Sequence, residues 1–356
     1  MRVCILGAGI SSLTLAKALV NQNIYVDVFS SQKTLKPDPS RTLGISKSNT
    51  DFFKKYIIDI EKIIWKIKKI EIFTDNLKNE KLINFENNIA LFSIVKNSQL
   101  FEVLKKSLSK SKYFKIINLK NSKLLEKYEL VINTEFSNFF TKKFFNKKII
   151  KKYKSTAYTT VIKHSKINNK IASQIFTKKG PLAFLPISSN ETSVVYSFSG
   201  EKNQKNDSIF KLIHKYNLKY KIEKIDKIKS FKLISINLRS YYNGNILAFG
   251  DLLHRIHPLA GQGFNMTIRD IKILLKIIKT KKELGLLLDS SINSEFEKKI
   301  KHKNFIFSQG VDFIHEFFNF ERKFSNNILS KSVQILGKNN SINNFFKKVA
   351  DQGILA

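Results

Sequence analysis

Hydrophobic positions follow two different periods along residues 1–30 of the chain. The apolar run VCIL predicts a buried strand, and the run YVDVF, which ends at Phe29, predicts a second one. Between these runs, apolar residues return with helical spacing and form one stripe that would face a sheet. The stripe consists of Leu13, Ala16, Leu19 and Val20. Strand, helix and strand in this order predict a βαβ unit and an α/β fold.

Strand-like runs dominate the middle of the chain. We expect helices over residues 52–70 and 98–109, and strands in the runs EIFTD, KLINF and ELVIN. Residues 141–235 then bring β-branched and aromatic runs separated by polar turns, as in TAYTTVIKH and TSVVYSFS. Such runs are typical of an antiparallel sheet. Because this region lies between parts of an α/β pattern, we expect a second domain inserted into the first.

A buried strand, a long loop and a helix follow one another after residue 236. The strand is ILAF, and the loop GDLLHRIHPLAGQGFN extends from Gly250 to Asn265. The helix has one apolar face, which consists of Met266, Ile268, Ile271, Leu274, Leu275 and Ile278. The loop therefore lies between a strand end and a helix start, where open α/β sheets bind ligands.

A glycine-rich turn, GAGISS, joins the first strand to the first helix. Gly7 would allow the tight turn, Gly9 would let the backbone approach a pyrophosphate, and the helix start would offer unpaired N–H groups. The position of the turn predicts a dinucleotide site. Ser12 stands at the third glycine position, and Ser30 stands where an acidic residue usually holds the ribose hydroxyls. A serine there makes one neutral hydrogen bond, which is weaker than a charge-assisted pair.

The chain is strongly basic, but its basic residues are not clustered. It has 63 Lys and Arg against 28 Asp and Glu, a formal net charge of +35. Because the lysines are spread along the whole chain, we expect no nucleic-acid partner, while an attraction to acidic lipid head groups stays open. The single cysteine, Cys4, lies in an apolar run and is interpreted as a buried hydrophobic residue, so no disulfide framework is possible.

The N-terminus and the hydropathy of the chain bear on its location. MRVCILGAG has glycines where a signal peptide needs its apolar stretch, and no apolar run is long enough to span a bilayer. We therefore expect a cytoplasmic protein, with a peripheral position on the inner membrane as the further alternative.

Four segments carry a resemblance to a known family. They are RTLGIS from Arg41, VINTEFSN from Val131, GPLAFLPIS from Gly180, and the loop GDLLHRIHPLAGQGFN with Asp270 behind it. In order and spacing they resemble the arginine motif, the A-D-G motif, the GPLA-x-LP motif and the second FAD-binding motif of the single-component flavin aromatic hydroxylases. Within that group the loop is most similar to the ubiquinone-biosynthesis hydroxylases, whose loop reads GD-A-A-H-x-x-H-P-L-A-G-Q-G-x-N.

This resemblance implies FAD as the cofactor and NAD(P)H as the reductant. Asp251 would accept hydrogen bonds from the ribityl hydroxyls, the loop glycines would admit the flat ring, and His257 and Pro258 would position the loop beside its reacting face. The implied cofactor-binding residues are Gly7, Gly9, Ser12, Ser30, Arg41, Asp251, Pro258, Gly261, Gln262, Gly263 and Asn265.

The two histidines of the loop stand in an HxxH pattern. No third ligand has a convincing spacing, so we expect no metal at His254 and His257. A hydrogen-bonded structural role is the preferred interpretation of both side chains.

The activity that the resemblance implies is hydroxylation of an aromatic ring with O2. The substrate would be a polyprenylated phenol or a related quinone precursor in ubiquinone biosynthesis, held against the sheet that carries Leu182, Phe184 and Leu185.

Four positions depart from the family, all near the adenosine and pyrophosphate end of the cofactor. Beside Ser12 and Ser30, Ser98 replaces an arginine that often reaches the phosphates, and Asn133-Thr134-Glu135 replaces A-D-G. The loop that would hold the isoalloxazine is complete, which favours an enzyme with looser FAD binding. The alternative is a catalytically silent, flavoprotein-like scaffold subunit of a quinone-biosynthesis complex.

We expect three regions in the chain. A Rossmann-like FAD-binding domain would take up residues 1–70, 95–140 and 236–290, and an antiparallel-sheet substrate domain would take up residues 71–94 and 141–235. Residues 291–356 would form C-terminal helices that pack on the FAD-binding domain. Their apolar stripes are Phe307, Val311, Ile314 and Phe318, then Ile328, Leu329, Val333 and Leu336. The alternative is a surface for a membrane or a partner, to which Phe313, Phe317, Phe345 and Phe346 would add apolar area.

Overall fold

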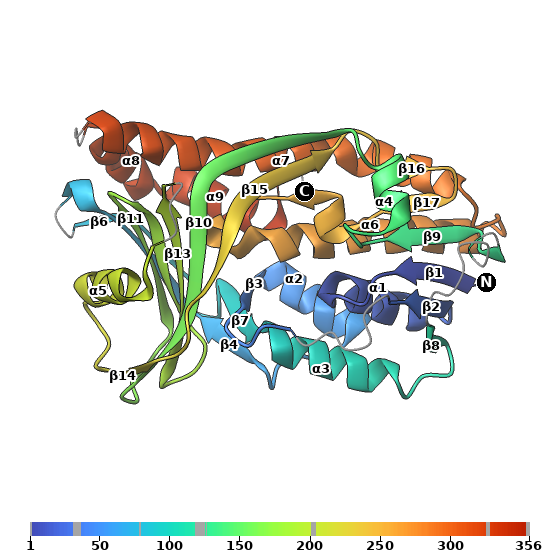
Figure 1. Ribbon diagram of the computed structural model, residues 1–356, viewed down its shortest axis with the longest axis horizontal. Helices are drawn as coiled ribbons and strands as arrows, with labels where there is room; N and C mark the ends of the chain where they lie inside the picture. The colour runs from blue at the N-terminus through green and yellow to red at the C-terminus, as the bar shows by residue number, and fades with distance from the viewer. Residues whose placement is uncertain are drawn as a thin grey trace.

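A computed structural model describes residues 2–30, 37–77, 80–117, 125, 127–200, 204–324 and 328–353. The chain builds an α/β fold with a parallel sheet, a large mixed sheet and a helical C-terminal part (Figure 1). This architecture confirms the predicted fold class.

The predicted βαβ unit forms the centre of a six-stranded sheet. The strand order is β16-β17-β9-β1-β2-β8, and all neighbours run parallel except β16 and β17. The strands are β1 (Arg2–Leu6), β2 (Tyr25–Phe29), β8 (Phe114–Ile117), β9 (Leu130–Asn133), β16 (Tyr242–Asn243) and β17 (Ile246–Ala248). Because side chains on both faces of the central strands are buried, β1 and β9 are apolar almost throughout.

Helices cover this sheet and complete the larger core. They are α1 (Ile10–Val20), α3 (Asn97–Leu108) and α6 (Gln262–Glu283), joined by the short α4 (Phe139–Phe144) after β9. The apolar stripe predicted for α1 and that predicted for α6 from Ile268 onward are buried in this core, while Met266 is buried in a second cluster with α7, so both stripes are confirmed as buried. Cys4 is fully buried there, and burial raises the pKa of its thiol.

The helix predicted over residues 52–70 is wrong for most of its length. The helical segment is α2 (Lys47–Phe52), which continues as one π-helical turn (Phe53–Ile57). Residues beyond it belong to β4 (Ile64–Ile67), which pairs with β7 (Phe92–Lys96), and β7 pairs with β3 (Thr42–Ser46) in a small antiparallel sheet. The apolar side chains of β4 contact Phe92 and Ile94, so tertiary packing overrides the helical spacing of this segment.

A nine-stranded sheet forms the second half of the molecule. Its order is β18-β15-β10-β13-β12-β11-β5-β6, with β14 paired to β10, and only β5 and β11 run parallel. The strands are β5 (Lys69–Thr74), β6 (Lys81–Glu86), β10 (Lys148–His164), β11 (Ile171–Thr177), β12 (Gly180–Pro186), β13 (Glu191–Ser199), β14 (Ile222–Ile225), β15 (Lys229–Leu238) and β18 (His254–Arg255). Helix α5 (Asn206–Tyr216) packs on one face of this sheet, and the long strands β10 and β15 reach across to the parallel-sheet half (Figure 1).

The C-terminal part is helical, as predicted. It consists of α7 (Ser291–Phe324), α8 (Ile328–Lys338) and α9 (Asn340–Gln352). Phe307, Val311 and Phe318 of α7 are buried, whereas Ile314 is 43% exposed and Leu336 of α8 is 52% exposed. The two predicted stripes are therefore wrong at Ile314 and Leu336, because the helices contact the rest of the protein along narrower faces than their apolar spacing suggests.

Candidate functional site

Three of the predicted motifs follow neighbouring strands at one edge of the parallel sheet. Leu6 at the end of β1 pairs with Asn133 of β9, and Asn133 pairs in turn with Ala248 of β17. The glycine turn, the segment in place of A-D-G and the start of the long loop therefore emerge side by side. The carboxyl ends of parallel strands are where open α/β sheets bind ligands, so this edge is the candidate site.

Helix α1 begins at this edge, and no described side chain caps the backbone N–H groups of its first turn. Gly7 has a φ of +101°, a conformation that favours glycine, and Gly9 is the N-cap of α1. A Cβ added to Gly9 would meet nothing within 4 Å. The unpaired N–H groups can therefore receive an anion such as a phosphate.

The long loop packs against this helix start through its own first glycine. Gly250 has a φ of +63°, and a Cβ there would lie 2.9 Å from the Cβ of Ser11 in the first turn of α1. The next residue, Asp251, is exposed at the strand end. The loop thus places a carboxylate beside the start of α1.

The second half of the loop packs against β3, the strand of the arginine motif. A Cβ on Gly261, whose φ is +63°, would lie 3.5 Å from the Cα of Gly44. The buried Asn265 accepts a hydrogen bond from the backbone N–H of Ser46 at 2.9 Å and donates one to the carbonyl of Gly44 at 3.0 Å. Asn265 therefore fixes the loop to β3.

Helix α6 begins inside this loop without a side-chain cap. Its N-cap is Gly261, no described side chain caps it, and a Cβ on Gly263 would meet nothing within 4 Å. Gln262 is 9% exposed, and its Oε1 has no hydrogen-bond partner among the described residues. Pro258 is half-buried just before this start. An unsatisfied carbonyl and open helix N–H groups are suited to a polar, flat group that approaches from outside.

Three residues that differ from the family motifs lie together at the end of β1, namely Ser12, Thr134 and Glu135. The Ser12 hydroxyl lies 2.7 Å from that of Thr134, and Thr134 donates to the carbonyl of Leu6 at 2.9 Å. A Cβ on Gly7 would lie 2.5 Å from the Thr134 hydroxyl and 3.6 Å from the Cβ of Glu135. Thr134 and Glu135 therefore stand beside the turn that would approach the pyrophosphate.

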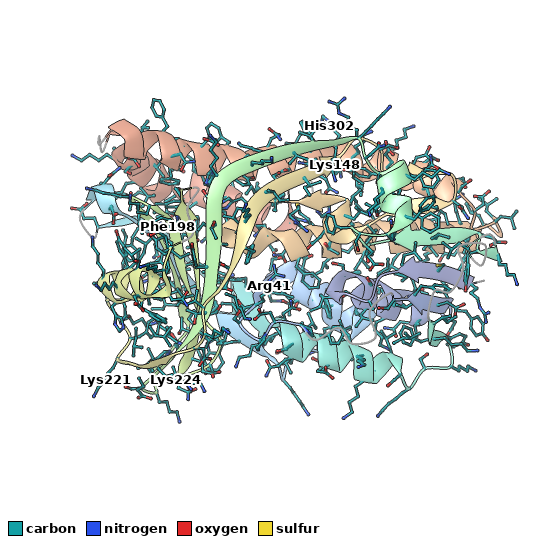
Figure 2. The ribbon with its side chains drawn as sticks, in the orientation of Figure 1. Arg41, Lys148, Phe198, Lys221, Lys224 and His302 are labelled. Atoms are coloured by element: carbon teal, nitrogen blue, oxygen red, sulfur yellow. The ribbon has the colours of Figure 1, made fainter. Side chains whose placement is uncertain are left out.

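The remaining predicted residues are Ser30, Ser98 and Arg41, and they lie on or next to three different elements. Ser30 follows β2 and is 9% exposed, and Ser98 is half-buried in the first turn of α3. Arg41 is exposed, and its guanidinium carbon lies 5.0 Å from the ring centroid of Phe231 in β15 (Figure 2). Arg41 therefore bridges the small sheet and the nine-stranded sheet, and its contact with a cofactor stays a prediction.

The two histidines of the loop have different surroundings. His254 Nε2 lies 2.6 Å from Asp270 Oδ2, and Asn304 donates to Asp270 Oδ1 at 3.1 Å, all three being buried. The hydrogen-bonded role predicted for His254 is confirmed. It is wrong for His257, because neither of its ring nitrogens has a hydrogen-bond partner among the described residues.

His257 instead packs between aromatic rings. Its ring centroid lies 4.8 Å from that of Tyr153 and 4.5 Å from that of His315 on α7. Burial, followed by His315 and Lys151, lowers the pKa of His257 to about 3. The imidazole is neutral at physiological pH. Within the described ranges, no group of three His, Cys, Asp or Glu side chains is arranged to hold a metal ion.

The three residues named for the sheet that would hold the substrate lie on both of its faces. Leu182 and Phe184 are buried in the cluster beneath α5, together with Ile209 and Ile213 of that helix. Leu185 has the opposite orientation and packs with the small sheet. Side chains alternate along β12, so the motif GPLAFLPIS presents Ala183 and Leu185, rather than Leu182 and Phe184, to the other face.

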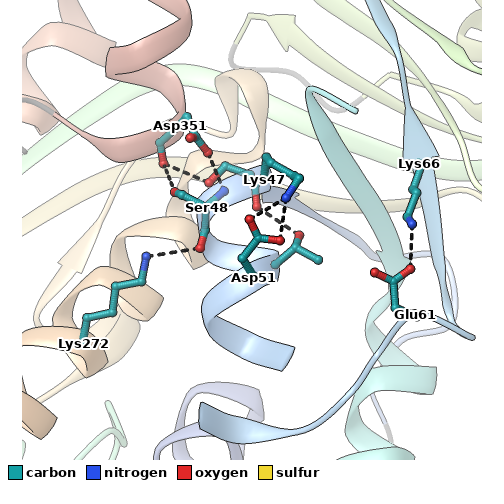
Figure 3. A network of polar contacts seen from close by, with 9 residues as sticks. Lys47, Ser48, Asp51, Glu61, Lys66, Lys272 and Asp351 are labelled. Atoms are coloured by element: carbon teal, nitrogen blue, oxygen red, sulfur yellow. Dashed lines mark hydrogen bonds and ion pairs between the residues drawn. The ribbon is translucent and has the colours of Figure 1, made fainter. Parts of the chain in front are cut away.

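The C-terminal helix α9 reaches this site, which no pattern in the sequence predicted. Asp351 in α9 accepts hydrogen bonds from Ser46 Oγ at 2.9 Å and from the backbone N–H of Ser48 at 2.8 Å (Figure 3). Lys272 of α6 joins the same network through Asn49 Oδ1, 2.9 Å away. These contacts connect residues 303 to 305 positions apart, and no local pattern signals them.

The chain resembles known flavoproteins by sequence. Residues 147–282 match the family described as FAD binding domain. The 3-demethoxyubiquinol 3-hydroxylase of Escherichia coli (strain K12) is 28% identical over 162 residues, which are 44% of this chain and 40% of that protein. The mitochondrial ubiquinone biosynthesis monooxygenase COQ6 of Drosophila melanogaster is 24% identical over 205 residues, which are 47% of this chain and 43% of that protein. The chain thus spans less than half the length of these curated relatives.

Solved structures resemble the whole chain. The p-nitrophenol 4-monooxygenase PnpA of Pseudomonas putida DLL-E4 has a TM-score of 0.78 at 12% identity, over 99% of this chain and 98% of that one. Klebsiella pneumoniae HpxO, solved with FAD and uric acid, has a TM-score of 0.76 at 11% identity, over 99% and 97% of the two chains. The chain therefore has the fold of these solved structures, its residues 147–282 match the FAD binding domain family, and part of its sequence is similar to ubiquinone hydroxylases.

Proposed function

We propose that this protein is an FAD-dependent monooxygenase that hydroxylates the aromatic ring of a polyprenylated phenol in ubiquinone biosynthesis, with NAD(P)H as the reductant. The observation that carries the proposal is the convergence of the two glycine loops, in which Gly250 packs on Ser11 and Gly261 packs on Gly44. It brings together two uncapped helix starts, which offer N–H donors, and Asp251, which offers a carboxylate acceptor, and a flavin dinucleotide requires both kinds of group.

Each residue of the site has a role in this proposal. The start of α1 receives the pyrophosphate, Asp251 accepts hydrogen bonds from the ribityl hydroxyls, and the start of α6 directs N–H groups at the edge of the ring. His257 and Pro258 hold the loop in place, and the neutral imidazole adds no charge to an apolar substrate site. Bound FAD supplies the chemistry of O2 activation, and the protein orients the substrate and excludes water.

The division into domains is part of the same proposal. An FAD-binding domain of residues 1–70, 95–140 and 236–290 would contain all strands of the six-stranded sheet. A substrate domain of residues 71–94 and 141–235 would contain most of the nine-stranded sheet, and residues 291–356 would contain the C-terminal helices.

The competing function is a catalytically silent scaffold subunit of a quinone-biosynthesis complex. The observation that favours it is the position of Thr134 and Glu135, which lie against Gly7 where a phosphate would approach. The Cβ of Glu135 lies beside this turn, and a negative charge on that side chain would oppose a phosphate at the positive end of α1. Looser FAD binding is expected under the enzyme proposal, and no binding under the scaffold proposal.

The test combines cofactor binding with product analysis. Purified protein titrated with FAD should bind it, and the chain should restore the missing product in cells that lack their own ubiquinone ring hydroxylases. The accumulated precursor, identified by mass spectrometry, would give the ring position. A protein that binds no FAD, or that binds FAD and leaves the precursor pool unchanged, would contradict the enzyme proposal. A protein without FAD that still raises ubiquinone levels would support the scaffold.

The location of the protein follows from its proposed substrate. Within the parts of the chain that the structure describes, no helix is both long and apolar enough to cross a bilayer. A polyprenylated phenol resides in the membrane, so a cytoplasmic enzyme would have to reach it from the surface, alone or within a quinone-biosynthesis complex.

A further inference from the structure

The C-terminal hairpin, which consists of α8 and α9, exposes large apolar side chains. Ile335 and Leu336 of α8 are 68% and 52% exposed, and Phe345 and Phe346 of α9 are 62% and 45% exposed. None of the described residues of α9 is buried. Large apolar side chains that are exposed in adjacent pairs indicate a surface that contacts a membrane or another molecule.

The other side of the hairpin is already occupied. Val333 and Val349 pack toward the cluster beneath α7, and the side-chain amides of Gln334 and Asn343 donate to the carbonyls of Lys81 and Asn84 at 2.9 and 3.0 Å. The hairpin is thus attached along β6, and its exposed apolar residues are not used by this attachment.

The charge of the hairpin indicates what the exposed residues contact. Its described sequence has four lysines and one acidic residue, and Asp351 is engaged with Ser46 and Ser48. Lys331, Lys338 and Lys348 are exposed. Apolar rings flanked by lysines are typical of helices that lie in the interface of an anionic membrane.

We propose that the C-terminal hairpin docks the protein on an anionic lipid bilayer, with Phe345 and Phe346 in the interface and the lysines at the head groups. This inference rests on the proposed function, which places the substrate in the membrane. The hairpin is hydrogen-bonded through Asp351 to β3, and Asn265 holds β3 against the long glycine loop. Docking there places the site next to the membrane that contains the substrate.

The experiment is a flotation assay with the full chain loaded with FAD. Vesicles of phosphatidylcholine alone are compared with vesicles of equimolar phosphatidylcholine and phosphatidylglycerol, at low and high salt. We expect binding to the anionic vesicles that salt weakens, and at least a tenfold lower partition coefficient for the double variant Phe345→Ser with Phe346→Ser. Lys338→Gln with Lys348→Gln should weaken binding to the anionic vesicles alone.

The matched control is Leu286→Ser with Leu287→Ser, an equally exposed apolar pair after α6. It should bind as the parent does. The inference is overturned if the parent fails to bind, if it binds both vesicles equally, or if the phenylalanine variant binds like the parent. It is also overturned if light scattering shows a dimer that the phenylalanine variant dissociates, because the occupant would then be a second copy of the chain.

The same preparations separate this inference from the proposed function. Thermal unfolding and FAD titration of each variant report whether the site is intact. Vesicle binding without FAD binding would contradict only the proposed function, and FAD binding without vesicle binding would contradict only the docking surface.

Discussion

The hydroxyl of Ser12 donates a hydrogen bond to the hydroxyl of Thr134 across 2.7 Å, because Thr134 uses its own proton on the carbonyl of Leu6. The two residues replace a glycine and an aspartate of the related hydroxylases, so the two departures satisfy each other. Together they connect the first turn of α1, the end of β1 and the loop after β9. The pair therefore stabilises the arrangement of the candidate site.

Replacing Glu135 by Gln should tighten FAD binding. The side chain stands beside Gly7 at the start of α1, where its charge opposes a phosphate. Removal of one like charge should improve the dissociation constant by about threefold to tenfold, or roughly 1 kcal/mol. Titration by flavin fluorescence measures it. The control is Glu129→Gln, an exposed residue just before β9, which should leave the FAD affinity unchanged. An equal change of affinity in both variants would mean that only the net charge of the protein matters.

Replacing Asp251 by Ala should weaken FAD binding with little loss of fold. The exposed carboxylate would make charge-assisted hydrogen bonds worth about 1.5 to 3 kcal/mol, so the affinity should fall by roughly 10- to 100-fold. Asp251→Asn keeps a hydrogen-bond acceptor of the same shape, so its FAD affinity should lie between those of the parent and Asp251→Ala. An FAD affinity of Asp251→Ala equal to that of the parent would show that the loop has been misinterpreted.

Replacing Gly250 by Ala should destabilise the protein more than the same change at Gly285. Both glycines have nearly the same φ, +63° and +67°, so both substitutions carry the left-handed backbone cost of about 1 kcal/mol. Only Gly250 would also press a Cβ on Ser11, whereas a Cβ on Gly285 meets nothing within 4 Å. Chemical denaturation should show an additional loss of about 1 to 2 kcal/mol for Gly250→Ala. Equal losses would mean that the loop and α1 are not in contact.

Replacing His257 by Leu should make the protein less sensitive to acid. The folded pKa of about 3 lies below the unfolded value near 6.5, so the stability that the neutral imidazole contributes is present above pH 6.5 and is lost as the pH falls below it. The parent should lose roughly 1 to 2 kcal/mol between pH 6.5 and pH 5 from this one group.

The comparison for this experiment is the exposed His302 on α7, which faces solvent rather than Tyr153 and His315. Denaturation of His302→Leu should follow the pH dependence of the parent, while that of His257→Leu should be flatter. A parallel pH dependence for His257→Leu and the parent would place the acid sensitivity in other groups.

Local sequence patterns correctly predicted several of the helices and strands. The βαβ unit, the apolar face of α6 and the strands β9 and β13 were correct, because each element follows one period between clear turn signals. The segment from Phe52 to Ile70 failed because its apolar residues satisfy a helical spacing and also a strand that is buried beside Phe92. Local spacing does not separate the two.

The sequence predicted the glycines of the candidate site but not the contacts between residues far apart in the chain. The motifs located Gly7, Gly250 and Gly261, whose positive φ values require this residue type. They did not separate the two faces of β12, since an alternating strand buried on both sides has apolar residues at every position. The unpaired nitrogens of His257 depend on which side chains α7 brings there, and no spacing in the loop encodes that.

The bonds from Asp351 to Ser46 and Ser48 also constrain how the protein is made. Strand β3 leaves the ribosome early, but its polar partner is synthesised about 300 residues later, so the strand waits through most of translation before its last contacts form. Synthesis at ~5–20 residues per second makes that wait at least several seconds. During this interval Ser46 and Ser48 are without these partners, and a nascent chain stalled before residue 351 would hold the candidate site without the bonds from α9 to β3.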